Sequence, residues 1–429
     1  MTLKKLILSS VAALSLIGTS VYAADNSKGT AIATDGTGDY LVFPYYAAVG
    51  SWKTNIRVVN SNPTDAIVAK VVIREWKTSA EKLDFPIYLT PGDVWEATLT
   101  LENGKVVLKC NDDSMIVKGT PASVNPVSVA LFPEEGAQDN HYGYVEVFGV
   151  GQISAGAVQD MDNDGITWGG VGKPLDKDDL YAYYKSTLHA GNNPGDVWKG
   201  VDTDSLYGQE ILFAKNQYGN LAMTLAATAL EGVTGKNANA QQIIAADTTP
   251  DNVIIPDAGT TLNKVLGNVA EALRKKHVYA TYYDNGGNGV AETALILTQP
   301  MKKYLYPAGL SAIGYNYKDA DGNAATKSPL DYYFKYSTVA RDMKEHTNIE
   351  VNEFSGGKPV IHTCNTEICM FDAANYTGSF TNGYVDFDLS GNKIWANKQS
   401  GIHAIPVLMT AKNVEGTNVT NVITPAYKK

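Results

Sequence analysis

An aspartate-rich segment is the clearest candidate for binding chemistry in this sequence. Its carboxylates stand at alternate positions, Asp160, Asp162 and Asp164, and Gly165 follows them. Alternating carboxylates can converge on one Ca²⁺, as they do in the first half of an EF-hand loop. The complete EF-hand is excluded, because Val171 stands where its bidentate glutamate would be. The segment therefore predicts either calcium bound by a shorter loop at these three aspartates or a plain solvated turn.

The cysteines are the second group of residues that could carry chemistry. The chain has three, Cys110, Cys364 and Cys369, which allow at most one intramolecular disulfide. Cys364 and Cys369 close a small loop, and a bridge between them is our first expectation in an oxidising compartment. Pairing of Cys110 with either of them is the alternative. A zinc site with His362 lacks a fourth ligand.

Catalytic motifs are missing from the sequence. There is no Gly-x-Ser-x-Gly elbow and no His-Glu-x-x-His pair, and the six histidines are scattered. No glycine-rich loop stands between a strand and a helix, so nucleotide binding has no anchor. A glycosidase needs two carboxylates a few ångströms apart, but with 45 acidic residues such a pair arises by chance. We expect no catalytic activity, and no cofactor other than calcium.

The amino terminus has the three parts of a cleavable signal peptide. Lys4 and Lys5 come first, an apolar run follows, and small residues precede the expected cleavage between Ala23 and Ala24. The apolar run is short for a transmembrane span, and no later stretch approaches the required length of about 20 residues. Residues 1–23 are therefore predicted to be a signal peptide. The mature chain is expected to be soluble and exported, to the extracellular space, the cell surface or the periplasm.

The overall composition limits the partners. The net charge of −10 disfavours nucleic acid and anionic membrane surfaces, because both would repel the chain. A hydrophobic content of 44% is sufficient for a buried core. The length exceeds what one core usually organises, which suggests two domains or one domain with long insertions.

Short strands separated by turn residues dominate the rest of the chain. In residues 66–76 apolar side chains alternate, which predicts a strand with one buried face and one face in water. Residues 61–65 and Asn103-Gly104 are turn signals, and Pro86 indicates an edge strand. We expect strands at 40–46, 54–60, 66–76, 83–89, 93–101, 105–109, 142–149, 209–214, 221–230, 278–283, 292–298, 384–389 and 403–410.

Three parts of the mature chain differ in pattern. Residues 24–150 are strand-rich, residues 151–204 form a polar insertion rich in Gly, Asp and Tyr, and residues 205–429 are a second β-rich half. The second half is expected either to complete the sandwich begun by the first or to form a second domain. One amphipathic helix is predicted at 260–276. Glycines in 284–289 permit a hairpin between the strands on either side.

Tyrosine is abundant, with 25 residues against 10 phenylalanines. Tyr181-Ala-Tyr-Tyr184 lies in the polar insertion, near Trp168 and Trp198 in sequence. Exposed aromatic rings there would stack on sugars or dock a protein. The alternative is that the tyrosines occupy half-buried strand positions.

Several segments together resemble a loose group of uncharacterised secreted bacterial proteins, and the likeness spans most of the mature chain. The resemblance implies export and a β-sandwich, and it carries over no activity and no catalytic residues. The segments that carry it are Phe43–Tyr46, Trp52–Arg57, Val71–Glu75, Leu83–Trp95, Gly143–Val147, Ser205–Leu212, Thr228–Gly232 and Leu297–Lys303.

Taken together, the sequence predicts a mainly β protein: an antiparallel immunoglobulin-like sandwich with a long polar insertion and one amphipathic helix. The expected function is structural or adhesive, without catalysis, through a protein or glycan at the cell surface or through self-association. The alternative is a secreted polysaccharide-acting hydrolase or a carbohydrate-binding protein.

Overall fold

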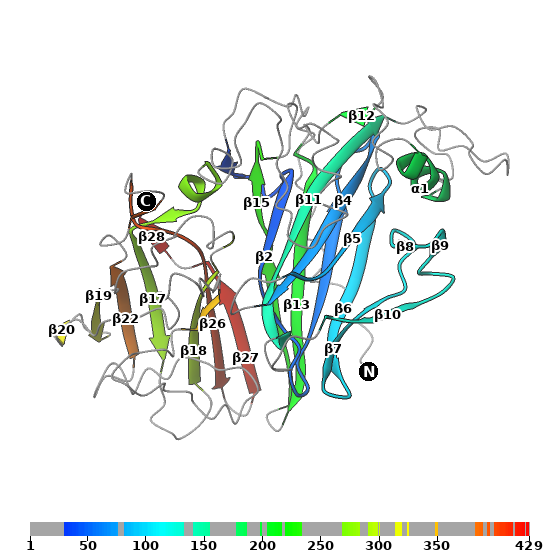
Figure 1. The fold of residues 1–429 in the computed structure, drawn as a ribbon. Coiled ribbons are helices and arrows are strands. Elements are labelled where there is room, and N and C mark those ends of the chain that lie inside the picture. The colour runs from blue at the N-terminus through cyan, green and yellow to red at the C-terminus, as the bar shows by residue number, and fades with distance from the viewer. Residues whose placement is uncertain are drawn as a thin grey trace, which may run out of the picture.

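The structure is a computed structural model (Figure 1). It describes residues 30–75, 81–132, 140–154, 177–186, 198–199, 204–216, 219–233, 268–283, 291–298, 300, 314–319, 324–325, 348–350, 382–388, 393–394, 399–414, 417–424 and 426–428. Within these ranges the protein is mainly β, and its strand pairs are antiparallel.

The first sheet has seven strands, in the order β1-β15-β2-β11-β4-β5 with β12 beside β11. Its central strand β11 is paired over its full length with β4. The strands are β1 (Ala31–Ile32), β2 (Tyr40–Ala47), β4 (Asp65–Glu75), β5 (Glu81–Leu89), β11 (Tyr142–Ser154), β12 (Trp198–Lys199) and β15 (Thr228–Glu231).

The second sheet has six strands, in the order β10-β7-β6-β3-β13-β14. The chain passes repeatedly between the two sheets, since β2, β4, β5, β11 and β15 lie in the first and β3, β6, β7, β10, β13 and β14 lie in the second. The strands of the second sheet are β3 (Lys53–Asn60), β6 (Val94–Glu102), β7 (Lys105–Cys110), β10 (Val127–Ala130), β13 (Leu206–Asn216) and β14 (Gly219–Ala226).

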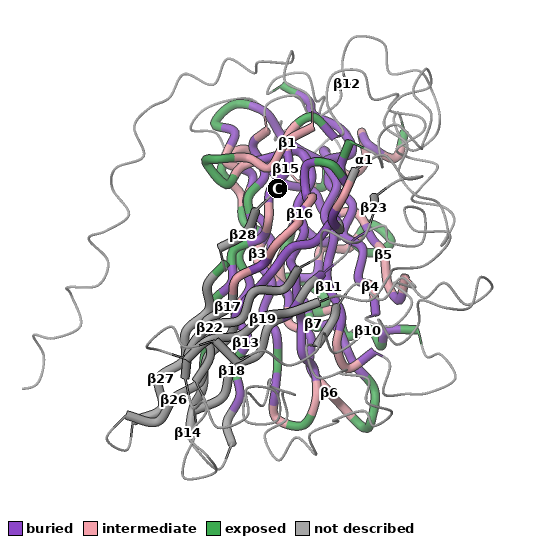
Figure 2. The backbone as a smooth tube through the Cα atoms, turned by 90° about the vertical axis from the view of Figure 1, so that its left-hand side faces the viewer, coloured by how far each residue is buried: buried purple, intermediate pink, exposed green. Residues whose placement is uncertain are grey.

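One hydrophobic core joins these two sheets. Phe43 and Val71 of the first sheet belong to the same buried cluster as Ile56 and Trp95 of the second. Apolar residues at alternate positions place one face of each strand in this core. Figure 2 shows buried backbone running through both sheets, with exposed residues gathered in the turns at their ends.

The outward face of β4 corrects one prediction. The alternation in residues 66–76 indicated one face in water, but Val68, Lys70 and Val72 are buried as well as the core-facing side chains. Strand β4 lies between β11 and β5 and is covered on both faces, so its outward side chains also lie in the interior. Pro86 does lie in an edge strand, because β5 ends the first sheet.

The backbone conformation of the turns is explained by the residues that form them. Asn103 and Gly104 have φ values of 51° and 76°, the two positive φ angles of a tight hairpin between β6 and β7. Between β3 and β4 the Asn62 Oδ1 accepts the backbone N–H groups of Thr64 and Asp65, at 2.9 Å each. The Asn62 side chain thus supplies the hydrogen-bond acceptor for these two backbone groups and closes the turn.

Residues 111–132 cover one open side of the two sheets. Ser114 O accepts the N–H of Tyr88 at 2.8 Å, and Phe132 donates to Lys82 O at 2.9 Å, so this segment borders the edge of β5. It contains the small pair β8 (Ile116–Val117) and β9 (Thr120–Pro121). Helix α1 (Lys177–Ser186) packs beside β5, at the upper right of Figure 1.

From residue 268 onward, the described strands form two further sheets and two small strand pairs. The third sheet has the order β20-β19-β22-β17-β28, and the fourth β21-β18-β26-β27. The strands are β16 (Arg274–Lys275), β17 (His277–Tyr283), β18 (Ala291–Thr298), β19 (Gly314–Asp319), β20 (Ala324–Ala325), β21 (Asn348–Glu350), β22 (Asn382–Asp388), β23 (Lys393–Ile394), β24 (Gln399–Ser400), β25 (Ile402–His403), β26 (Ile405–Val414), β27 (Thr417–Ile423) and β28 (Ala426–Lys428).

Two sequence-based expectations fail in this half. Strands β17 and β18 do not form the expected hairpin, because β17 pairs with β22 and β28 while β18 pairs with β21 and β26. The helix predicted at 260–276 ends too late. Residues 268–272 are helical, but Arg274 and Lys275 form β16 and pair with β25, and residues 260–267 lie outside the described residues.

The fourth sheet meets the first two at the end of β2. Ile296 and Val407 share a buried cluster with Tyr45 and Leu212. The pairing of β2 with β11 shifts register opposite Pro44, and the Thr298 hydroxyl donates to Pro44 O. A side chain of the second half therefore satisfies a backbone group that this irregularity removes from the ladder.

Candidate interaction surface

The structure does not describe most of the residues singled out from the sequence. Cys110 is described, and its thiol is free and buried. Both of its alternative partners lie outside the described residues, so that pairing stays a prediction. Burial raises the pKa of this thiol to about 11, which disfavours the reactive thiolate. The calcium, disulfide and signal-cleavage predictions lie outside the described residues and stay predictions: Asp160, Asp162, Asp164, Cys364, Cys369, Ala23 and Ala24.

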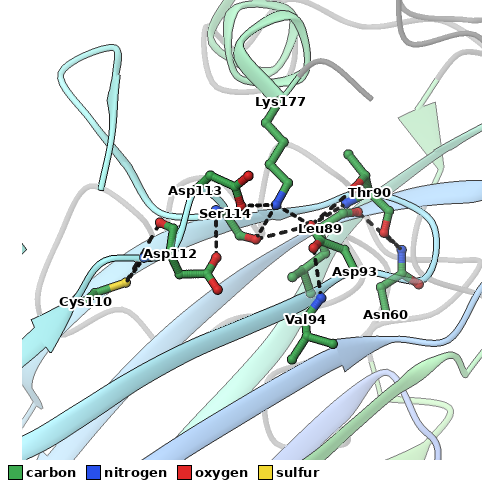
Figure 3. Close-up of polar contacts among 10 residues, drawn as sticks. All are labelled: Asn60, Leu89, Thr90, Asp93, Val94, Cys110, Asp112, Asp113, Ser114 and Lys177. Atoms are coloured by element: carbon green, nitrogen blue, oxygen red, sulfur yellow. Dashed lines mark hydrogen bonds and ion pairs between the residues drawn. The ribbon is translucent and has the colours of Figure 1, made fainter. Parts of the chain in front are cut away.

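A polar cluster at one end of the first two sheets gathers two acidic side chains and a serine around Lys177 (Figure 3). Lys177 Nζ lies 2.8 Å from Asp93 Oδ2 and from Ser114 Oγ, and it also contacts Asp113 Oδ1. Burial lowers the pKa of Lys177, but these carboxylates raise it by more. The ammonium group stays charged and occupies the centre of the cluster. Among the described residues no group of three His, Cys, Asp or Glu side chains is arranged to hold a metal.

This cluster attaches helix α1 to the sheets. Asp93 comes from the turn before β6, Ser114 from the segment after β7, and Lys177 is the first residue of α1. Asp93 also accepts hydrogen bonds from Thr90 and from Ser114, so it is part of the turn itself. The arrangement is a structural anchor, because its groups satisfy one another.

The tyrosines of α1 complete the attachment. Tyr88 of β5 makes edge contacts with the rings of Tyr181 and Tyr184, with centroids 5.4 and 5.6 Å away. Tyr184 is fully buried. These contacts pack α1 on the first sheet, while Tyr181 and Tyr183 are half-buried, so the aromatic surface expected there stays a prediction.

The outward face of the first sheet carries buried ionic groups. Glu146 Oε1 accepts the hydroxyl of Tyr40 at 2.6 Å, and its Oε2 lies 2.5 Å from Arg74 Nε. Burial and the Glu146 carboxylate raise the pKa of Tyr40. Glu146 is thus held between a cation and a hydroxyl that stays protonated, and this network stabilises a covered face.

A carboxyl pair lies beside this network. Asp84 Oδ2 is 2.6 Å from Lys70 Nζ, and the side chain of Glu81 hydrogen-bonds to Asp84. Burial, together with Asp84, raises the pKa of Glu81 to about 8. Two carboxyl groups in direct hydrogen bond are closer than the 5 Å or more that glycoside hydrolysis requires. The pair does not have the geometry of a glycosidase.

The outward face of the second sheet has a different character, because large side chains lie exposed on it. Tyr207 is 41% exposed and Phe213 is 36% exposed, both on β13, and Val94 of β6 is 42% exposed. The side chains that point outward from β3 and β13 form what we call the β3–β13 stripe. Its members are Lys53, Asn55, Arg57, Val59, Tyr207, Gln209, Ile211 and Phe213.

Strand register arranges the stripe in four rungs. Tyr207 is opposite Val59, Gln209 opposite Arg57, Ile211 opposite Asn55, and Phe213 opposite Lys53. The four pairs follow one another in this order along the strands, so Tyr207 and Phe213 lie at opposite ends of the stripe. Six residues of extended strand put their Cα atoms about 20 Å apart.

Polar contacts hold the middle of the stripe in place. The amide of Asn55 donates to Glu96 Oε1 at 2.9 Å and to Thr98 Oγ1 at 3.2 Å. Arg57 Nε lies 2.8 Å from Glu96 Oε2, and both side chains are more than 40% exposed. Neighbouring strands on each side support β3 and β13, so the surface is rigid.

Sequence reasoning predicted the strand at 209–214 but not its exposed face. Alternation was the available signal: Tyr207, Gln209, Ile211 and Phe213 share one face, and Gly208, Glu210 and Leu212 the other. Both faces mix polar and apolar residues, so alternation does not reveal which one faces the core.

Comparisons with known proteins add no relative. No protein-family model matches the chain, and searches among curated proteins and among solved structures return no significant match. Among the described residues, no helix is both long and apolar enough to cross a membrane.

Proposed function

We propose that this protein is an exported, non-catalytic structural or adhesion protein that binds its partner through the β3–β13 stripe. The observation that carries this proposal is the exposure of Tyr207 and Phe213 on an otherwise well-packed sheet. Large apolar side chains on a rigid, solvent-facing surface are typical of a contact site. Export rests on the signal-peptide pattern of residues 1–23.

The finer architecture in this proposal is an immunoglobulin-like β-sandwich. Two features support it: antiparallel sheets that share one core, and a chain that passes repeatedly from one sheet to the other. Such scaffolds present binding surfaces on their faces and loops without requiring an active site.

The absence of catalysis in this proposal is supported by how the ionisable clusters are used. Lys177 is engaged with Asp93 and Asp113, and Glu146 is engaged with Arg74 and Tyr40. Each group in these two clusters thus has a structural partner. A polysaccharide hydrolase is the competing class, and the hydrogen-bonded pair of Glu81 and Asp84 does not favour it.

Retention by the producing cells tests the proposed function. The Tyr207→Ser/Phe213→Ser variant should be released from washed cells into the medium, while the unaltered protein stays with them. A matched control is Phe132→Ser/Val124→Ser, because Phe132 and Val124 are also exposed, at 67% and 75%, but lie away from the stripe. Equal retention of all three proteins, at equal melting temperature, would show that the stripe is not the contact surface.

A further inference from the structure

We propose that the β3–β13 stripe binds an anionic polysaccharide. This inference rests on the proposed function, because it names the partner of the same surface. It starts from charge: the chain carries a net charge of −10, yet the outward face of the second sheet shows an excess of cations. Its exposed cations are Lys53, Arg57, Lys105 and Lys109, and its exposed carboxylates are Glu96 and Glu102.

Two of these four cations are engaged in ion pairs, and the other two can interact with a ligand. Arg57 pairs with Glu96, and Lys109 pairs with Glu102. Lys53 and Lys105 form no ion pair among the described residues, and both are exposed. A positive area on an acidic protein attracts anions and not the protein's own copies, whose surfaces are mostly negative.

The aromatic residues have the placement that a sugar chain needs. The flat apolar side of a pyranose ring packs against an aromatic face, while its hydroxyl groups require polar partners at the ring's edge. Tyr207 and Phe213 mark the two ends of the stripe, and Gln209 and Arg57 lie between them. A linear chain of several sugars lying along β13 would contact both rings, and Lys53 lies directly opposite Phe213 to receive a carboxylate.

A protein partner fits the stripe less well. Protein interfaces concentrate their binding energy in a central cluster of buried aromatic and Arg side chains. Here the Cα atoms of the two aromatic residues are about 20 Å apart, with polar and cationic residues between them. An extended ligand that touches separate points along a line matches this pattern better than a compact hydrophobic patch.

Binding to polygalacturonate, measured by calorimetry on the full chain, tests the inference. Fully methyl-esterified polygalacturonate is the matched probe, since it has the same sugar backbone without charge. We expect binding to polygalacturonate that weakens as salt rises, and at least about tenfold weaker binding to the ester. Tyr207→Ala and Phe213→Ala should each weaken binding by about tenfold, and Lys53→Gln should reduce the salt dependence.

Poly-glutamate and the Phe132→Ala variant provide the controls. Phe132→Ala should bind polygalacturonate like the unaltered protein. Equal affinity for poly-glutamate and polygalacturonate, or affinity unaffected by Tyr207→Ala and Phe213→Ala, would overturn the inference, because charge alone would then explain binding. If polygalacturonate does not bind but retention by cells still depends on Tyr207 and Phe213, the proposed function stands and this inference fails.

Discussion

Glu210 places a carboxyl group in the interior of the second sheet. The residue is fully buried, and its Oε1 accepts the backbone N–H of Tyr45 at 3.4 Å, next to the register shift in β2. Burial raises the pKa of Glu210 well above its usual value. Burial therefore favours the neutral form of this carboxyl group, which from β13 supports the irregular backbone of β2 at Tyr45.

The pH dependence of stability follows from this pKa. The folded state keeps a proton on Glu210 that the unfolded state releases above about pH 4.5, so the folded state binds more protons and stability falls as pH rises. Glu210→Gln preserves size and stays neutral. Its melting temperature should fall less between pH 5 and pH 8 than that of the unaltered protein. An identical slope in both proteins would show that Glu210 is ionised in the folded state.

Glu81 contributes to the pH dependence of stability with the same sign as Glu210, over a defined pH range. Because the pKa of Glu81 is raised to about 8, its contribution to the free energy of unfolding should fall from about pH 4.5 to pH 8 and level off above pH 8. Glu81 is partly exposed, so the effect should be smaller than for Glu210. Melting curves of Glu81→Gln across this range separate the two contributions, and a steeper fall in Glu81→Gln would contradict the assignment.

Gly143 allows β2 and β11 to approach closely. A Cβ atom at this position would lie 2.6 Å from a ring carbon of Tyr46 and would also meet Arg74 O. Gly143→Ala should reduce the free energy of unfolding by about 2–4 kcal/mol, because the overlap is with backbone. Gly92→Ala is the matched control: its φ is +75° but its surroundings are open, so about 1 kcal/mol is expected. Urea unfolding measures both, and equal losses would contradict the steric argument.

At the scale of elements, helix α1 depends on its first residue. Its own sequence favours a helix only modestly, with Asp178 and Asp179 in the first turn and Lys185 in the last. A helix of 10 residues is marginal without tertiary contacts. Lys177 and Tyr184 supply those contacts, through Asp93 and Tyr88.

Removal of the Lys177 charge should loosen this helix. In Lys177→Met the amides of α1 should exchange hydrogen about 10–100 times faster, which corresponds to roughly 1.5–3 kcal/mol for hydrogen bonds to charged groups. Lys185→Met, on the same helix, should exchange like the unaltered protein. If both variants exchange at the same rate, the cluster in Figure 3 does not hold α1.

At the scale of the whole molecule, the contact between the fourth sheet and the first two decides how the chain unfolds. Ile296 and Val407 pack against Tyr45 and Leu212, and Thr298 donates to Pro44 O. These contacts join residues far apart in the chain into one buried cluster. We expect the described sheets to unfold together in a single calorimetric transition.

Truncation at this contact should separate the halves. Ile296→Ala/Val407→Ala removes one buried apolar group from β18 and one from β26, and each change should cost about 1–4 kcal/mol. The double variant should show two calorimetric transitions where the unaltered protein shows one. Val129→Ala is the control, because this exposed residue lies at the far edge of the second sheet. A single, uniformly lowered transition in the double variant would show that the halves stay coupled through other contacts.

Local signals in the sequence determined the strands and many of the turns. Alternation predicted β4, and Asn103-Gly104 predicted its hairpin, because side-chain period and positive φ depend on neighbouring residues alone. The strand assignment of residues 221–230 is also confirmed, although the chain divides there into β14 and β15 of different sheets.

Only the tertiary structure decided which faces and ends these elements have. Arg274 and Lys275 have helix-compatible side chains, but pairing with His403 and Ile402 makes them a strand. Lys70 is polar, but its pairing with Asp84 allows it to be buried on the outward face of β4. On β13, Glu210 faces the interior and Phe213 faces solvent, the opposite of what polarity predicts. Burial depends on what packs against a face, and those partners come from strands distant in the sequence, so local pattern does not reveal the surface proposed to bind.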